Sequence, residues 1–130
     1  IGPKDIENGQ VVVVRRDTRE KIVVSIDEIT TKLGEILEMI QKDLYAKAKA
    51  FLDEHISTAT TIEEMKDAVQ NKKGFVKAMW CSESACEDEI KAQAGGVTSR
   101  CIPMEEEHLS DVCVCCGKPA KHMVYWGRAY

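Results

Sequence analysis

All six cysteines of this 130-residue chain lie in its last fifty residues, and this clustering constrains the fold more than any other feature. The first eighty residues contain no cysteine, and no secretion signal is visible, so the three disulfides of a small secreted domain are a poor fit. Close pairs of cysteines in one segment instead favour a metal site in a reducing compartment. The six are Cys81, Cys86, Cys101, Cys113, Cys115 and Cys116.

Two pairs among these cysteines have the spacing of a four-thiolate zinc site. Four residues separate Cys81 from Cys86, and two separate Cys113 from Cys116. A tight turn lets two such thiolates reach one ion, and Gly117 accepts the positive φ that the turn requires. With four thiolate ligands, zinc has no position for water or substrate, so the predicted metal is structural.

The sequence alone leaves other residues as possible ligands of the metal. Cys115 competes with its neighbour Cys116, although only one residue would then separate it from Cys113. His108 and His122 could also replace a cysteine, and Cys101 is interpreted as a small packing side chain. A redox pair at Cys113-x-x-Cys116 is an alternative, but the segment after it does not resemble the helix start that such pairs use.

The hydrophobic pattern predicts an α+β chain. Two β-branched runs, 11–14 and 22–26, flank a polar turn and predict a hairpin that needs further strands to cover it. Apolar residues at steps of three and four predict a long helix from about 27 to 55. Residues 1–9 are predicted to be a loop. Further helices are predicted at 62–70 and 84–94, and further strands at 75–80, 98–102 and 122–126, followed by a bend at Gly127.

Composition narrows the class of protein. Hydrophobic residues make up 44% and charged residues 31%, which is typical of a folded globular domain. A net charge of −4 argues against a module that grips nucleic acid by charge alone. We find no apolar run of the roughly 20 residues that would cross a membrane, no nucleophile with a neighbouring base and no glycine-rich phosphate loop. The start Ile1-Gly2-Pro3, without an initiator Met, is interpreted as the edge of a fragment, and the acidic run 105–107 as a solvated loop.

Several stretches in order along the whole chain resemble the C-terminal part of prolyl-tRNA synthetases of the archaeal and eukaryotic type. They are IGPKD at 1–5, VRRDT at 14–18, the region from Trp80-Cys81 to Ile90-Lys91, SRCIP at 99–103, CVCCGKPAK at 113–121 and the ending GRAY at 127–130.

This resemblance implies a fold and a division into three parts. Residues 1–28 would be a β-hairpin remnant of an α/β anticodon-binding domain, and 29–57 a connector helix. Residues 58–130 would be a small zinc-binding α/β domain with a short antiparallel sheet, its Zn²⁺ held by Cys81, Cys86, Cys113 and Cys116. The carboxylate of Tyr130 would approach the active site of the parent enzyme.

The resemblance also implies a function for the parent. It would be a cytoplasmic class II aminoacyl-tRNA synthetase, a homodimeric ligase of protein biosynthesis that activates proline with ATP and Mg²⁺ and transfers it to tRNA(Pro). The catalytic domain would lie outside this chain, so the fragment itself would be inactive, and no membrane partner is expected. The alternative is a stand-alone zinc-ribbon module that binds nucleic acid or protein. That reading predicts a basic face around the metal, which the five basic and eight acidic residues of 81–130 oppose.

Overall fold

The computed structural model describes residues 1–129, and the chain divides into two compact units, Ile1–Ala50 and Phe51–Tyr130. We describe each unit by itself. Among the described residues, no helix combines the length and the apolar composition needed to span a bilayer.

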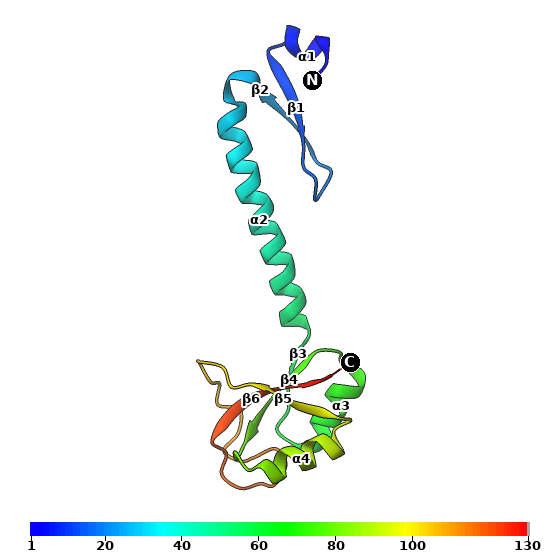
Figure 1. Cartoon of the computed structure of the whole chain (residues 1–130), viewed down its shortest axis with the longest axis vertical. Helices are drawn as coiled ribbons and strands as arrows, with labels where there is room; N and C mark the ends of the chain where they lie inside the picture. Colours follow the sequence, from blue (N-terminus) through cyan, green and yellow to red (C-terminus); the bar gives the residue numbers. More distant parts are fainter. Residues whose placement is uncertain (130) are drawn as a thin grey trace. The chain divides into compact units, whose positions relative to one another are not determined.

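The first unit contains the predicted hairpin and most of the predicted long helix. The two strands pair antiparallel, with Gln10 opposite Ser25. The long helix runs over 26 residues and confirms the predicted one to within two residues at its start. The elements are α1 (Pro3–Glu7), β1 (Gln10–Val14), β2 (Lys21–Ser25), the 3₁₀ helix η1 (Ile26–Glu28) and α2 (Ile29–Glu54), which continues into the second unit (Figure 1).

Helix α1 occupies a segment that was predicted to be a loop, so that prediction is wrong. Pro3 stands at the first helical position, where its fixed φ suits a helix and its missing N–H costs nothing. The Gly2 N–H donates to Asp5 Oδ2 at 2.8 Å, which closes the single turn. The glycine and proline signals therefore mark the start of a short helix here.

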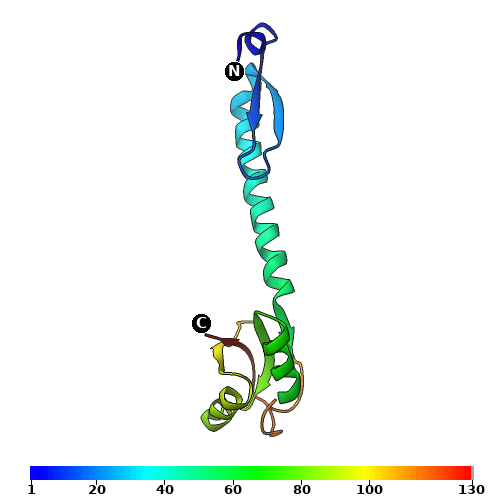
Figure 2. The same cartoon turned by 90° about the vertical axis from the view of Figure 1, so that its right-hand side faces the viewer.

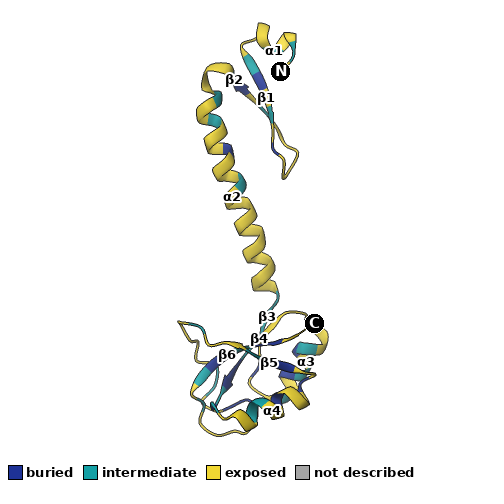
Figure 3. Cartoon of the chain, viewed as in Figure 1, coloured by how far each residue is buried: buried dark blue, intermediate teal, exposed yellow. Residues whose placement is uncertain are grey.

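Arg15 ties the hairpin to α2 within the first unit. Its side chain is only 4% exposed, and its Nη2 donates to Asp17 Oδ2 at 2.7 Å and to Asp43 Oδ2 at 2.6 Å. Arg15 directly follows β1, where the sequence predicts the start of a polar turn, yet its side chain is buried. Along the rest of α2 only Ile36 is buried, and Figure 3 shows that most of the helix surface is exposed.

The second unit is built on one four-stranded sheet in the order β3-β4-β6-β5. β6 pairs antiparallel with both of its neighbours, in line with the predicted antiparallel sheet, whereas β3 lies parallel to β4 at the edge. Figure 2 shows the strands of this unit together with its two short helices. The sequence pattern did not indicate β3. The elements are β3 (Ile56–Thr58), α3 (Ile62–Asn71), β4 (Phe75–Trp80), α4 (Ser84–Gln93), β5 (Val97–Cys101) and β6 (His122–Arg128).

The core of this unit lies between the sheet and its two short helices. Because Val76 pairs with Trp126 and Ala78 with Val124, these side chains share one face of the sheet, and α3 and α4 both contribute to the same core. Figure 3 shows this core as the largest buried region of the chain. The largest fully buried side chains are Trp126, Met65, Ile90, Met123, Val97 and Val124.

The predicted bend at Gly127 is absent. Strand β6 continues through Arg128, because Gly127 pairs with Phe75 on one side and with Thr98 on the other. Pairing on both edges keeps this glycine extended, although the lack of a side chain would have permitted a turn. The chain therefore stays in the sheet two residues longer than the sequence pattern indicated.

Candidate metal centre

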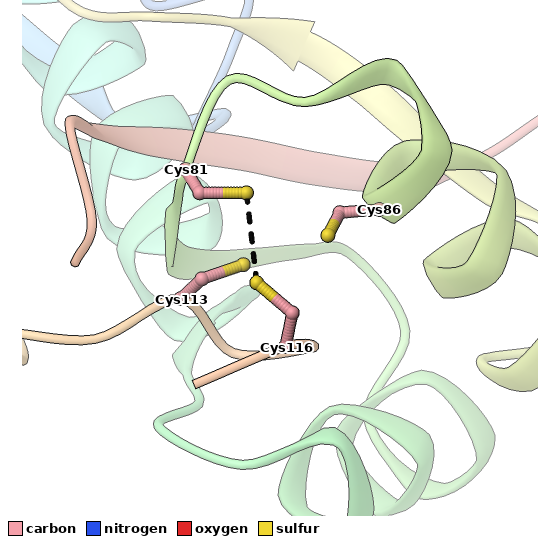
Figure 4. A group of neighbouring side chains, drawn as sticks. All are labelled: Cys81, Cys86, Cys113 and Cys116. Carbon is pink, nitrogen blue, oxygen red and sulfur yellow. Dashed lines mark hydrogen bonds between the residues drawn. The ribbon is translucent and has the colours of Figure 1, made fainter. Parts of the chain in front are cut away.

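Four cysteines from three separate segments meet at one end of the sheet. Cys81 directly follows β4, and Cys86 lies in the first turn of α4. Cys113 and Cys116 lie in the loop before β6. The four sulfur atoms all lie within 4.8 Å of one another, and Figure 4 shows them pointing toward a common centre.

The spacing of the sulfur atoms fits a tetrahedral ion. Zinc–sulfur bonds of about 2.3 Å place two ligand sulfurs about 3.8 Å apart in a regular tetrahedron. The Sγ atoms of Cys81 and Cys116 are 3.7 Å apart. None of the six cysteines forms a disulfide, so all four sulfurs of the group are available as ligands.

Backbone hydrogen bonds build the turn that carries Cys113 and Cys116. The Cys113 N–H donates to the Lys118 carbonyl at 2.8 Å, and the Gly117 N–H donates back to the Cys113 carbonyl at 3.1 Å. Gly117 has a φ of +68°, a conformation that glycine adopts without steric cost. The predicted role of this glycine is therefore confirmed.

Two further bonds hold this turn against β4. The Val114 N–H donates to the Met79 carbonyl at 2.9 Å, and the Lys121 N–H donates to the Trp80 carbonyl at 2.8 Å. Ser82, between the first two cysteines, has a φ of +69°, which is rare for a residue with a side chain. The backbone therefore holds the turn that carries Cys113 and Cys116 against the end of the strand that precedes Cys81.

Three thiols of this group have pKa values that differ from the ordinary value of a cysteine. Burial raises the pKa of the Cys81 thiol and also that of Cys86. The backbone N–H of Lys118 lowers the pKa of Cys116 to about 7. Burying several thiolates together without a cation is costly, whereas a divalent ion would compensate their charge. A set of four soft sulfur donors selects zinc or iron–sulfur chemistry rather than magnesium or calcium.

The alternative ligands lie outside the group of four sulfurs. Cys115 is half-buried and packs against the core of the unit, where burial raises the pKa of its thiol. Cys101 is exposed on β5. His108 pairs with the carboxylate of Asp111, and His122 contacts Glu106.

A family model described as "Prolyl-tRNA synthetase, C-terminal" matches residues 62–130, which is more than half of the chain. The chain belongs to this family. A second family model, described as "Anticodon binding domain", matches residues 1–36. The two matches agree with the resemblance that the sequence motifs indicate, and with the predicted α+β architecture.

The chain aligns over all of its own residues with relatives in this family. The proline–tRNA ligases of Lachnoclostridium phytofermentans and Clostridium novyi are 62% and 56% identical to it over 130 residues. A crystal structure of the Cryptosporidium parvum prolyl-tRNA synthetase with halofuginone and AMPPNP is 36% identical, with a TM-score of 0.90. The chain spans 27% of the length of each of these three proteins.

Tyr130, the predicted terminal carboxylate, lies outside the described residues.

One contact in this prolyl-tRNA synthetase unit adds to what the sequence pattern indicated. Glu106, in the supposedly solvated acidic loop, accepts the Met123 N–H at 2.6 Å and contacts His122 Nδ1 at 3.0 Å. His122 lowers the pKa of this carboxyl group. This loop is therefore fastened to β6, and no local sequence signal reveals it, because the partners are sixteen residues apart.

Proposed function

We propose that this chain is the C-terminal part of a cytoplasmic, homodimeric proline–tRNA ligase, a class II aminoacyl-tRNA synthetase. The parent enzyme would activate proline with ATP and Mg²⁺ and transfer it to tRNA(Pro). The observation that carries this proposal is the 62% identity to a proline–tRNA ligase along all 130 residues. Residues 1–28 would complete the anticodon-binding domain, and residues 58–130 would form the C-terminal zinc-binding domain. Residues 29–57 would form the helix that connects these two domains.

Proline-dependent exchange between ATP and pyrophosphate tests the activity. The full-length parent should catalyse the exchange and charge tRNA(Pro), whereas the 130-residue chain alone should do neither. A parent whose exchange between ATP and pyrophosphate depends on another amino acid, and not on proline, would contradict the assignment.

In the parent, the terminal carboxylate of Tyr130 would approach the catalytic centre, as the resemblance implies.

We also propose that the four-cysteine group holds one structural Zn²⁺ through Cys81, Cys86, Cys113 and Cys116. The sulfur separation and the absence of disulfides support this ligand set. When bound, the ion would supply folding free energy to the unit that encloses it. Four thiolate ligands would leave it no open position for chemistry.

Elemental analysis of protein purified under reducing conditions should find one zinc per chain. Cys116→Ser should lose the metal and loosen residues 74–130, while the β1–β2 hairpin keeps its protection from hydrogen exchange. Cys101→Ser is the matched control, because this exposed cysteine lies outside the group and its replacement should leave the zinc content unchanged. A well-folded wild-type chain without metal would contradict the proposed site.

A further inference from the structure

Cys86 differs from the other three cysteines of the proposed metal centre in what holds it. Cys81 directly follows β4, and backbone hydrogen bonds hold the turn of Cys113 and Cys116 against the end of that strand. Cys86 instead lies in the first turn of helix α4, and Figure 4 shows it on that helix. Its sulfur stays within 4.8 Å of the other three only while this turn keeps its place.

The first turn of α4 has no side-chain cap. Its N-cap residue is Glu83, whose side chain accepts no hydrogen bond from the helix backbone. The first N–H groups of a helix without such a cap lack a protein partner, and the end of the helix frays more readily. The buried side chain of α4 is Ile90, one turn further along the helix from Cys86. A contact other than the cap and the core is therefore needed to hold the turn that carries the cysteine.

Glu87 supplies such a contact. Its Oε1 accepts the Ser99 N–H at 3.3 Å, and the Ser99 hydroxyl donates to the same oxygen. Ser99 lies in β5, which is an edge strand of the sheet and pairs with β6 on one side only. The carboxylate thus binds the edge of the sheet, where no further strand follows, and joins the first turn of α4 to it.

The charge of Glu87 argues for a role in positioning rather than in neutralising the centre. Four thiolates around one Zn²⁺ would carry two more negative than positive charges, and Glu87 directly follows Cys86 in the sequence. A further anion beside such a centre is electrostatically unfavourable. The hydrogen bonds that the carboxylate accepts from Ser99 therefore explain its place better than its charge does.

We propose that Glu87 is a positioning residue of the metal centre, which keeps Cys86 within reach of the ion by binding Ser99 on β5. This inference rests on the zinc site proposed above and adds a residue that acts on it without being a ligand. Glu87 acts through Cys86, because the two residues share one turn of α4. A carboxamide at this position could accept the same two hydrogen bonds, whereas a methyl group accepts none.

Competition with a chromophoric chelator measures the zinc Kd of the 130-residue chain and its variants. Glu87→Ala should raise the Kd at least about tenfold, as the loss of a contact that orients a metal ligand typically does. Glu87→Gln should stay within about threefold of the wild type, because its side-chain oxygen still accepts from Ser99. Glu89→Ala is the matched control and should leave the Kd unchanged, since this carboxylate lies in the same helix and contacts Gln93 of that helix.

A double-variant cycle tests whether Glu87 acts through Ser99. Ser99→Ala removes the hydroxyl and leaves the backbone N–H, so it should raise the Kd less than Glu87→Ala does. In the Glu87→Ala background the same change should have no further effect, because the acceptor is already absent. An equal effect of Ser99→Ala in the two backgrounds would overturn the proposed contact.

Alkylation identifies which cysteine leaves the ion. With zinc bound and iodoacetamide limiting, Glu87→Ala should be modified at Cys86 before the other three cysteines of the group, whereas the wild type and Glu87→Gln should be protected at all four. Cys101 is the internal reference, because it is exposed and lies outside the group. A general loss of structure would expose all four cysteines together, and circular dichroism of each variant verifies that it is folded.

Three results would overturn the proposal: an unchanged Kd in Glu87→Ala, a Kd of Glu87→Gln as high as that of Glu87→Ala, or even alkylation of the four cysteines in folded Glu87→Ala. These results differ from a failure of the zinc site itself. A wild-type chain that binds no zinc would contradict the metal centre and this inference together. Zinc bound equally tightly by the wild type and Glu87→Ala would contradict this inference alone.

Discussion

Helix α4 presents Cys86 to the proposed metal centre, and the side chain of Ile90 packs that helix into the core beneath the sheet. Ile90 is the only buried residue of α4, and it is fully buried. Ile90→Ala removes three carbon atoms from a packed core. Their transfer contributes about 2.5 kcal/mol at 0.8 kcal/mol per carbon, and the cavity adds to this. We expect the free energy of unfolding of this unit to fall by about 3 to 4 kcal/mol.

The same substitution should weaken zinc binding, because a poorly docked α4 no longer positions its cysteine. The loss of zinc affinity cannot exceed the loss of docking energy. Since about 1.4 kcal/mol corresponds to tenfold, 3.5 kcal/mol sets an upper bound of about 300-fold. We expect the zinc Kd of Ile90→Ala to rise at least tenfold and to stay below this bound.

Met65→Ala is the matched control for this prediction. It also removes three heavy atoms from a fully buried side chain of the same core, but α3 carries none of the four cysteines. Urea unfolding with and without zinc measures stability, and competition with a chromophoric chelator measures the Kd. Both variants should lose several kcal/mol, and Met65→Ala should change the Kd less than threefold. Equal changes of the Kd in the two variants would refute the reasoning that α4 positions the ligand.

Two further predictions concern the polar contacts that fix single elements. Thr61→Ala removes the hydroxyl that accepts the Glu64 N–H at the start of α3, and should lower the free energy of unfolding by about 1 kcal/mol in urea titrations, whereas Thr61→Ser should retain most of it. Hydrogen bonding from Arg15 lowers the pKa of Asp17, so its stabilising effect is complete above the ordinary pKa of Asp and is lost as the pH falls through the lowered one. Amides of the β1–β2 hairpin should therefore lose protection from hydrogen exchange below about pH 4, and a similar pH dependence in Arg15→Met would contradict the assignment.

Local sequence patterns correctly predicted the elements whose structure depends on residues close together in the sequence. The Thr61-x-x-Glu64 spacing predicted the start of α3, and the structure has both reciprocal bonds of the capping box. Strand β4 matches its prediction at both ends, since its β-branched and aromatic run is bounded by Gly74 and Cys81. Paired cysteine spacing was equally informative about which cysteines lie close together, because two short turns are enough to bring the sulfurs of each pair near one another.

Features that depend on distant partners were not predictable in this way. Strand β3 has three residues and becomes a strand only because it lies parallel to β4. Its approach requires Gly74, whose missing side chain leaves room for the His55 carbonyl to accept the Phe75 N–H at 2.8 Å.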